Sequence, residues 1–147
     1  MSASITGRYE LGDFHLQSDV VLRDAFIGFR SYGSLNESRD NVIVFPTWYT
    51  GLNDQVEPYI GSGKALDPRK YFIVVPDMFT NGSSSSPSNA HEMHKGLNFP
   101  LVTTFDNVKA QRRLLEENFG IKSVELMVGF SMSGQQAYHW AALHSDL

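Results

Sequence analysis

The chain has 147 residues, of which 41% are hydrophobic and 19% charged, a composition typical of a single globular domain. A formal net charge of −4 with scattered lysines and arginines argues against nucleic acid as a partner, and the absence of cysteine excludes disulfides, thiolate metal sites and a cysteine nucleophile. The N-terminal residues lack the apolar core of a secretory signal, and no stretch reaches the roughly 18 apolar residues of a membrane helix. We therefore expect a cytoplasmic protein with no membrane partner.

Antiparallel strands are predicted near the start of the chain, because residues 25–30 alternate with a period of two. One set is Ala25, Ile27 and Phe29, and the other is Phe26, Gly28 and Arg30. Turns are expected near Gly12 and Ser18. Three short runs rich in β-branched residues follow, each typical of a parallel strand that is buried on both faces. These runs are NVIVFP at 41–46, YFIVVP at 71–76 and SVELMVG at 123–129.

A helix is predicted in VTTFDNVKAQRRLLEENFG, ahead of the third run, because its apolar residues fall near one helical face with charges opposite. Those residues are Phe105, Val108, Leu115 and Phe119. Thr103 and Asp106 have the spacing of a capping box, and Gly120 suits the left-handed C-terminal residue. A second helix is expected at 133–144. The pattern predicts an α/β fold in which antiparallel N-terminal strands precede a mostly parallel sheet with flanking helices.

A Gly/Ser/Pro/Asn-rich stretch at 80–100, TNGSSSSPSNAHEMHKGLNFP, joins the second apolar run to the first helix. A loop of about twenty residues is uncommon inside a compact domain and is often functional. Two interpretations stay open: the stretch lines a site, or it is a surface excursion.

The strongest chemical signal is GFSMSG at 129–134, between the third run and the second helix. In a nucleophile elbow, a serine on a strained strand-to-helix turn is flanked two residues away by small residues, because larger side chains would strike the neighbouring backbone. Ser131 fits this pattern as a nucleophile, with Gly129 and Ser133 at the small positions. A frame centred on Ser133 fails because it puts Gln135 at a small position.

Two backbone N–H groups are predicted to stabilise an oxyanion beside Ser131. Met132 would begin the helix, so its N–H points toward the developing charge with the helix dipole behind it. The second donor is expected in the loop after the first apolar run, PTWYTG at 46–51, and we assign it to the N–H of Tyr49. The side chains of Trp48 and Tyr49 are interpreted as loop packing.

Other motifs are weaker. GSGKA at 61–65 resembles a phosphate loop but has Pro58 where glycine is needed and Ala65 where Ser or Thr is needed. His91 and His94 have no evident third ligand, so we predict solvated loop histidines and no metal site. His139 and His144 are interpreted as packing or surface residues, and His15 lies in a predicted N-terminal strand with no chemical context.

The chain resembles the homoserine O-acetyltransferase-like branch of the α/β-hydrolases over nearly its whole length. The resemblance rests on YGSLN, NVIVFPTWYTG, YIGSGKALDPRKYFIVVPDMFTNGSSSSPSN, FPLVTTFDNVKAQRRLLEENFGI and GFSMSGQQAYHWAALHSD. It implies that Ser131 carries the acyl group, that Tyr49 and Met132 are the oxyanion donors, and that a later aspartate and histidine complete the triad. Transferase members of the family use acetyl-CoA as the acyl donor, whereas no bound cofactor is expected.

Two motifs and one single position depart from the homoserine acetyltransferases. Those enzymes usually read HALTG in the oxyanion loop and GGSMGG at the elbow, where this chain reads TWYTG and GFSMSG, and they often have arginine in place of Phe105. The resemblance is therefore closer to the hydrolase and acyltransferase relatives, whose substrates are small esters or thioesters.

The triad order in this fold is serine, then acid, then histidine. Only sixteen residues follow Ser131, so the acid and the base are predicted to lie outside this chain. We expect residues 1–147 to form a partial α/β-hydrolase domain that ends after the helix following the elbow. Two functions stay open: acyl transfer or ester hydrolysis through Ser131, or a non-catalytic fragment that is inactive alone or needs a partner chain. An exposed sheet edge at 123–128 is also predicted to favour self-association.

Overall fold

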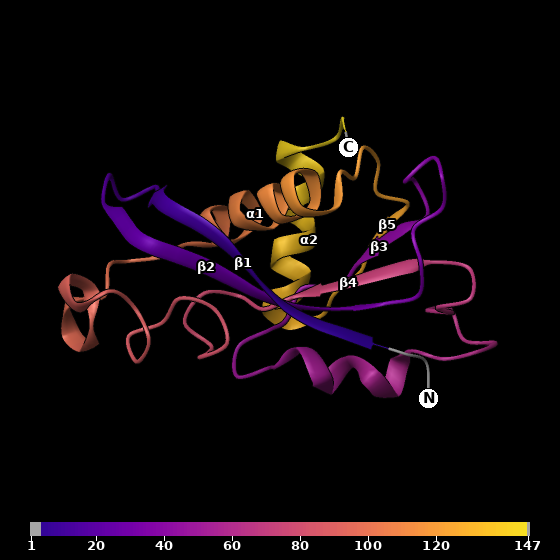
Figure 1. The fold of residues 1–147 in the computed structure, drawn as a ribbon, viewed down its shortest axis with the longest axis horizontal. Helices are drawn as coiled ribbons and strands as arrows, with labels where there is room; N and C mark the ends of the chain where they lie inside the picture. Colours follow the sequence, from indigo (N-terminus) through magenta and orange to yellow (C-terminus); the bar gives the residue numbers. More distant parts are fainter. Residues whose placement is uncertain (1–3, 147) are drawn as a thin grey trace.

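The computed structural model describes residues 4–146 and contains a five-stranded mixed sheet with the strand order β1-β2-β4-β3-β5. Helices α1 and α2 cover one face of this sheet, and the 3-10 helix η1 lies on the other (Figure 1). Strands β1 and β2 pair antiparallel, as do β2 and β4, whereas β3 pairs parallel with both β4 and β5. The strands are Ser4–His15, Val21–Tyr32, Val42–Val44, Phe72–Pro76 and Leu126–Met127. The predicted fold class is confirmed.

The predicted turn at Gly12 is wrong, whereas the turn near Ser18 is confirmed. Gly12 has φ +65° and sits at register shifts inside β1, so it marks a β-bulge within a strand. The turn lies four residues later, where the N–H of Leu16 donates to the carbonyl of Val20 at 2.9 Å. A glycine that ends a strand and a glycine that bulges one look alike in sequence, because both supply a positive φ.

Helix α1 spans Thr104–Arg113 and continues through a π-helical turn, Leu114–Asn118. The predicted capping box is present, since the N–H of Thr103 donates to Asp106 Oδ2 at 2.8 Å and the N–H of Asp106 donates to the Thr103 hydroxyl at 3.4 Å. Gly120 ends the segment with φ +63°, as predicted. The π turn was not expected, and both Leu114 and Leu115 are fully buried within it.

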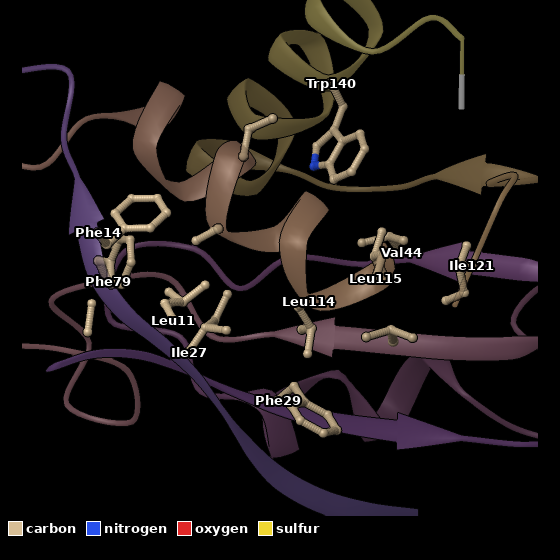
Figure 2. Packing of buried hydrophobic residues seen from close by; sticks show 14 of the residues in the cluster. Leu11, Phe14, Ile27, Phe29, Val44, Phe79, Leu114, Leu115, Ile121 and Trp140 are labelled. Carbon is tan, nitrogen blue, oxygen red and sulfur yellow. The ribbon is translucent and has the colours of Figure 1, made fainter. Parts of the chain in front are cut away.

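Two apolar clusters explain why the short runs were apolar on both faces. One cluster lies between the sheet and the two α-helices and includes Val44, Leu115 and Trp140 (Figure 2). The second lies on the opposite face under η1, Asn53–Tyr59, and includes Ile43 and Phe45. Neighbouring residues of β3 therefore enter different clusters, as period-two geometry requires.

The last strand is shorter than predicted: β5 covers only two of residues 123–129, and Leu126 is 46% exposed at the edge of the sheet. Helix α2, Ser131–Leu143, follows after three residues. Within residues 4–146, no helix is long and apolar enough to cross a membrane.

Candidate active site

Ser131 occupies a strained turn between β5 and α2. It is the first residue of α2, its side chain is exposed, and its φ of +53° lies in the left-handed region that non-glycine residues rarely adopt. Strain of this kind costs on the order of 1–3 kcal/mol and persists only where the surroundings impose it. A serine hydroxyl lifted on such a turn is the geometry of a nucleophile elbow.

Gly129 has no room for a side chain. A Cβ placed there would lie 2.6 Å from both the backbone carbon and the carbonyl oxygen of Ser133, and closer still to the Ser133 hydroxyl. The steric argument for a small residue therefore holds on the strand side of the turn.

Ser133 occupies the other small position and is fully buried. Its Oγ donates to the carbonyl oxygen of Pro46 at 2.6 Å. Ser133 replaces the glycine that is usual at this position, and its hydroxyl is bound to Pro46 in the loop after β3.

The loop after β3 lies beside the N-terminus of α2. The N–H of Met132 lies in the first turn of that helix, where N–H groups have no intrahelical acceptor. The N–H of Tyr49 has no acceptor among residues 4–146. Tyr49 is 73% exposed, so the predicted packing role of its side chain is wrong. Trp48 packs on Phe130 with ring centroids 4.5 Å apart, which agrees with a packing role for this indole.

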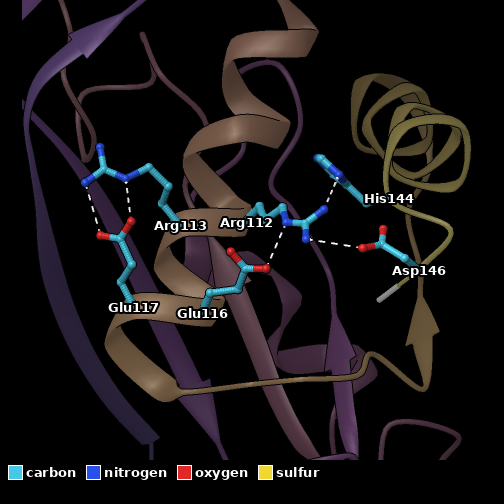
Figure 3. Close-up of polar contacts among 6 residues, drawn as sticks. All are labelled: Arg112, Arg113, Glu116, Glu117, His144 and Asp146. Carbon is cyan, nitrogen blue, oxygen red and sulfur yellow. Dashed lines mark hydrogen bonds and ion pairs between the residues drawn. The ribbon is translucent and has the colours of Figure 1, made fainter.

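His144 and the late acid, Asp146, lie beyond the far end of α2 from Ser131. His144 follows the C-terminal end of α2, and a helix of 13 residues is about 20 Å long. Arg112 contacts His144 Nδ1 at 2.6 Å and Asp146 Oδ2 at 3.4 Å (Figure 3). Burial, reinforced by the positive charge of Arg112, lowers the pKa of His144. Within the described part of the chain, no histidine is hydrogen-bonded to the Ser131 hydroxyl.

The two weaker motifs have structural explanations. The N–H of Gly63 in the GSGKA loop donates to Asp67 Oδ2 at 2.9 Å, and Lys64 Nζ donates to the carbonyl of Pro58 at 2.5 Å. In a phosphate loop this N–H would bind the phosphate, but here the N–H of Gly63 is bound to the carboxylate of Asp67. The prediction of solvated histidines is wrong for His94, which is buried, whereas His91 is exposed. Over residues 4–146, no group of three or more His, Asp or Glu side chains is arranged to hold a metal ion.

The stretch at 80–100 is bound to the sheet in its first part and exposed in its later part. Ser84 and Ser85 are buried, and their hydroxyls accept hydrogen bonds from the N–H groups of Gly28 and Phe26 in β2, both at 2.9 Å. Residues 95–98 are exposed. The first part is therefore built into the sheet, and only the later part is a surface excursion.

Sequence reasoning missed a buried acid beneath the loop after β3. Asp77, directly after β4, is fully buried and accepts hydrogen bonds from Asn53 Nδ2 at 2.5 Å and Asn81 Nδ2 at 2.9 Å. Asn81 also donates to the carbonyl of Gly51 at 3.2 Å. Burial raises the pKa of Asp77, although both amides oppose the shift. The only available signal was an acid at the end of a buried strand.

A mixed sheet in this order, with a strained serine at the turn from a parallel strand into a helix, is the arrangement of an α/β hydrolase. A model of the α/β hydrolase fold family matches residues 40–147, and the chain belongs to that family.

The relatives are esterases and homoserine acetyltransferases, as the resemblance implied. The ethyl acetate hydrolase of Pseudomonas veronii is 42% identical over 144 residues, which cover 95% of this chain and 41% of that enzyme. The homoserine O-acetyltransferase of Saccharomyces cerevisiae is 35% identical over 136 residues, covering 88% of this chain and 28% of that enzyme. The crystal structure of an acetylester hydrolase from Corynebacterium glutamicum superposes with a TM-score of 0.91 at 39% identity, over 97% of this chain and 41% of that one. The chain thus spans about two fifths of the length of these esterases.

Proposed function

We propose that this chain carries the nucleophile half of a serine esterase, in which Ser131 forms an acyl-enzyme with a small ester. The observation that supports this most directly is the exposed Ser131 at φ +53°, at the first residue of α2. Thr50 and Thr80 are also exposed at positive φ, but neither is the first residue of an α-helix, which is where a nucleophile elbow holds its serine.

In the proposed reaction, Ser131 Oγ attacks the ester carbonyl carbon and loses its proton to a general base. The developing oxyanion accepts hydrogen bonds from the N–H groups of Met132 and Tyr49. Collapse of the tetrahedral intermediate breaks the bond to the alcohol, which leaves with that proton. Water then attacks the acyl-enzyme, releasing the carboxylic acid and restoring the serine. The base and its orienting acid lie outside residues 4–146 in this proposal.

Hydrolysis is favoured over transfer because identity is higher to the ethyl acetate hydrolase, at 42%, than to the yeast homoserine O-acetyltransferase, at 35%. A short acyl group, as in ethyl acetate, is the proposed substrate class. In the transferase alternative, acetyl-CoA is the donor and a hydroxyl acceptor replaces water. A second candidate, a chain that is inactive alone, is favoured by the distance between Ser131 and His144 along α2.

The test uses two proteins: the 147-residue chain, and a fusion of residues 1–147 to the C-terminal portion of the Pseudomonas veronii enzyme beyond the aligned region. We expect the fusion to hydrolyse 4-nitrophenyl acetate and Ser131→Ala to lower its kcat by a factor of about 10⁴ or more. Ser62→Ala, an exposed serine after η1, is the matched control and should leave kcat unchanged. Activity that survives Ser131→Ala would exclude this role.

The same pair of proteins separates the alternatives. The 147-residue chain alone should show no turnover above buffer, because the alkoxide is not generated at neutral pH without a base. Release of CoA from acetyl-CoA by the fusion, dependent on added homoserine, would instead support the transferase.

A further inference from the structure

The loop that bears Tyr49 is held at its first two residues, Pro46 and Thr47, by hydrogen bonds from two neighbouring elements. From α2, the Ser133 hydroxyl donates to the carbonyl of Pro46 at 2.6 Å, and Gln136 Nε2 donates to the carbonyl of Thr47 at 2.9 Å. From the other side, the N–H of Thr47 donates to the carbonyl of Pro76 at 3.0 Å. Ser133 and Gln136 are buried, so water does not compete for these carbonyls.

A chain of buried side chains fixes the direction of the Gln136 amide. The indole N–H of Trp140 can only donate, so the atom of Gln111 that receives it at 2.8 Å must be its oxygen. The NH₂ of Gln111 then donates to the oxygen of Gln136 at 2.5 Å. Because the Gln136 oxygen is thus occupied, its NH₂ faces Thr47, which has only a carbonyl oxygen to offer there.

The anchoring side chains share one face of the nucleophile helix. Ser133, Gln136 and Trp140 are spaced at i, i+3 and i+7, which places them on one side of α2. Ser131 begins the same helix, and Tyr49 lies two residues beyond Thr47 in the loop. One rigid element therefore carries the nucleophile and also grips the backbone that leads to the second oxyanion donor.

We infer that Ser133 and Gln136 are positioning residues that set the place of the Tyr49 N–H relative to the Ser131 hydroxyl. The inference rests on the proposed function. A donor in an oxyanion hole works only when it lies within hydrogen-bond reach of the oxyanion, and removal of one such donor costs about 10²–10³ in kcat. Ser133 in place of glycine is then a gain: its hydroxyl ties the loop to the helix, which glycine could not do.

The experiment removes one hydroxyl. Ser133→Ala keeps the Cβ and deletes only the bond to Pro46, and Ser133→Gly restores the glycine found at this position in many elbows. Ser31→Ala, at a buried serine of β2 that forms no hydrogen bond with the carbonyls of Pro46 and Thr47, is the matched control. Two readouts are taken: kcat and KM for 4-nitrophenyl acetate in the fusion, and hydrogen exchange of residues 45–52 in the 147-residue chain by mass spectrometry.

We expect both Ser133 variants to lower kcat about tenfold, with KM within about twofold of wild type, because transition-state binding is lost without loss of ground-state binding. Exchange at Thr47 and Gly51 should accelerate about tenfold, since a buried carbonyl loses its partner. Ser31→Ala should change neither readout.

If Ser133 only fills space, its variants will lower the melting temperature and leave kcat and loop exchange unchanged. That result would overturn the inference. If the wild-type fusion shows no Ser131-dependent turnover, the proposed function fails, and loop exchange still decides the anchoring: unchanged exchange in Ser133→Ala refutes it, and faster exchange confined to residues 45–52 supports it.

Discussion

Replacing Gly129 with alanine tests the packing of the elbow directly. The added Cβ would lie 2.6 Å from two backbone atoms of Ser133, whereas ordinary contacts begin at 3.4 Å, so the two segments must separate by about 0.8 Å. Overpacking of this kind costs about 1–3 kcal/mol. The shift also stretches the Ser133–Pro46 hydrogen bond, which is worth about 1 kcal/mol net. We expect Gly129→Ala to lower the free energy of unfolding by about 3 kcal/mol.

The measurement is denaturant unfolding followed by circular dichroism, with Gly134→Ala as the control on the same helix. A Cβ at Gly134 would meet its nearest neighbour at 3.5 Å, an ordinary contact. Alanine is a better helix former than glycine by about 0.5–1 kcal/mol, so this variant should be slightly more stable than wild type.

The double variant Gly129→Ala, Ser133→Ala separates the two sources of the clash. It removes the hydroxyl but leaves the backbone atoms of residue 133 in place, so it should remain at least as unstable as Gly129→Ala. A Gly129→Ala protein within 0.5 kcal/mol of wild type, or full recovery in the double variant, would refute the backbone clash.

Ser131→Gly should raise the free energy of unfolding by about 1 kcal/mol relative to Ser131→Ala, because φ +53° strains alanine but not glycine; equal stabilities in thermal melts would show that the turn is unstrained. Burial raises the pKa of Asp77, so the folded chain binds this proton more readily than the unfolded chain, and the contribution of Asp77 to stability grows as pH falls through the raised pKa and levels off below the ordinary value. In Asp77→Asn that component should vanish, so unfolding at a series of pH values should give a pH-dependent difference from wild type; a constant difference would contradict the raised pKa. The open edge at β5 should make the 147-residue chain self-associate at micromolar concentration, and Leu126→Lys should reduce this association in light scattering. A sharp monomeric peak for the wild-type chain with a cooperative thermal transition would count against the exposed edge.

The parallel strands could be read from sequence because a strand covered on both faces leaves an uninterrupted apolar run. Ile43 and Val44 belong to clusters on opposite faces of the sheet, so successive residues of the run NVIVFP are apolar. The run SVELMVG predicted more strand than exists, because β5 pairs on one side only, with Ile43 and Val44 of β3. The tight turn around Ser131 was predictable for a local reason, since Gly129 and Ser133 lie within four residues of each other.

The contacts that hold the site together could not be predicted, because their partners are distant in the chain. Asn53 and Asp77 are 24 residues apart, and Ser133 and Pro46 are 87 apart. Periodicity and capping report only neighbours within a helical turn or a strand. A polar side chain such as Gln136 has no local pattern that reveals a buried carbonyl as its partner.

The stretch at 80–100 has one part whose length is fixed by hydrogen bonds to β2 and a later part whose length can vary. Ser84 and Ser85 replace a backbone neighbour for two N–H groups of β2, so adding or deleting one residue before them would move both hydroxyls out of register. Residues 95–98 are exposed and make no such pairing with the sheet. A peptide tag or a fluorescent label inserted at 95–98 would therefore extend outward while the elbow and its loop stay in place.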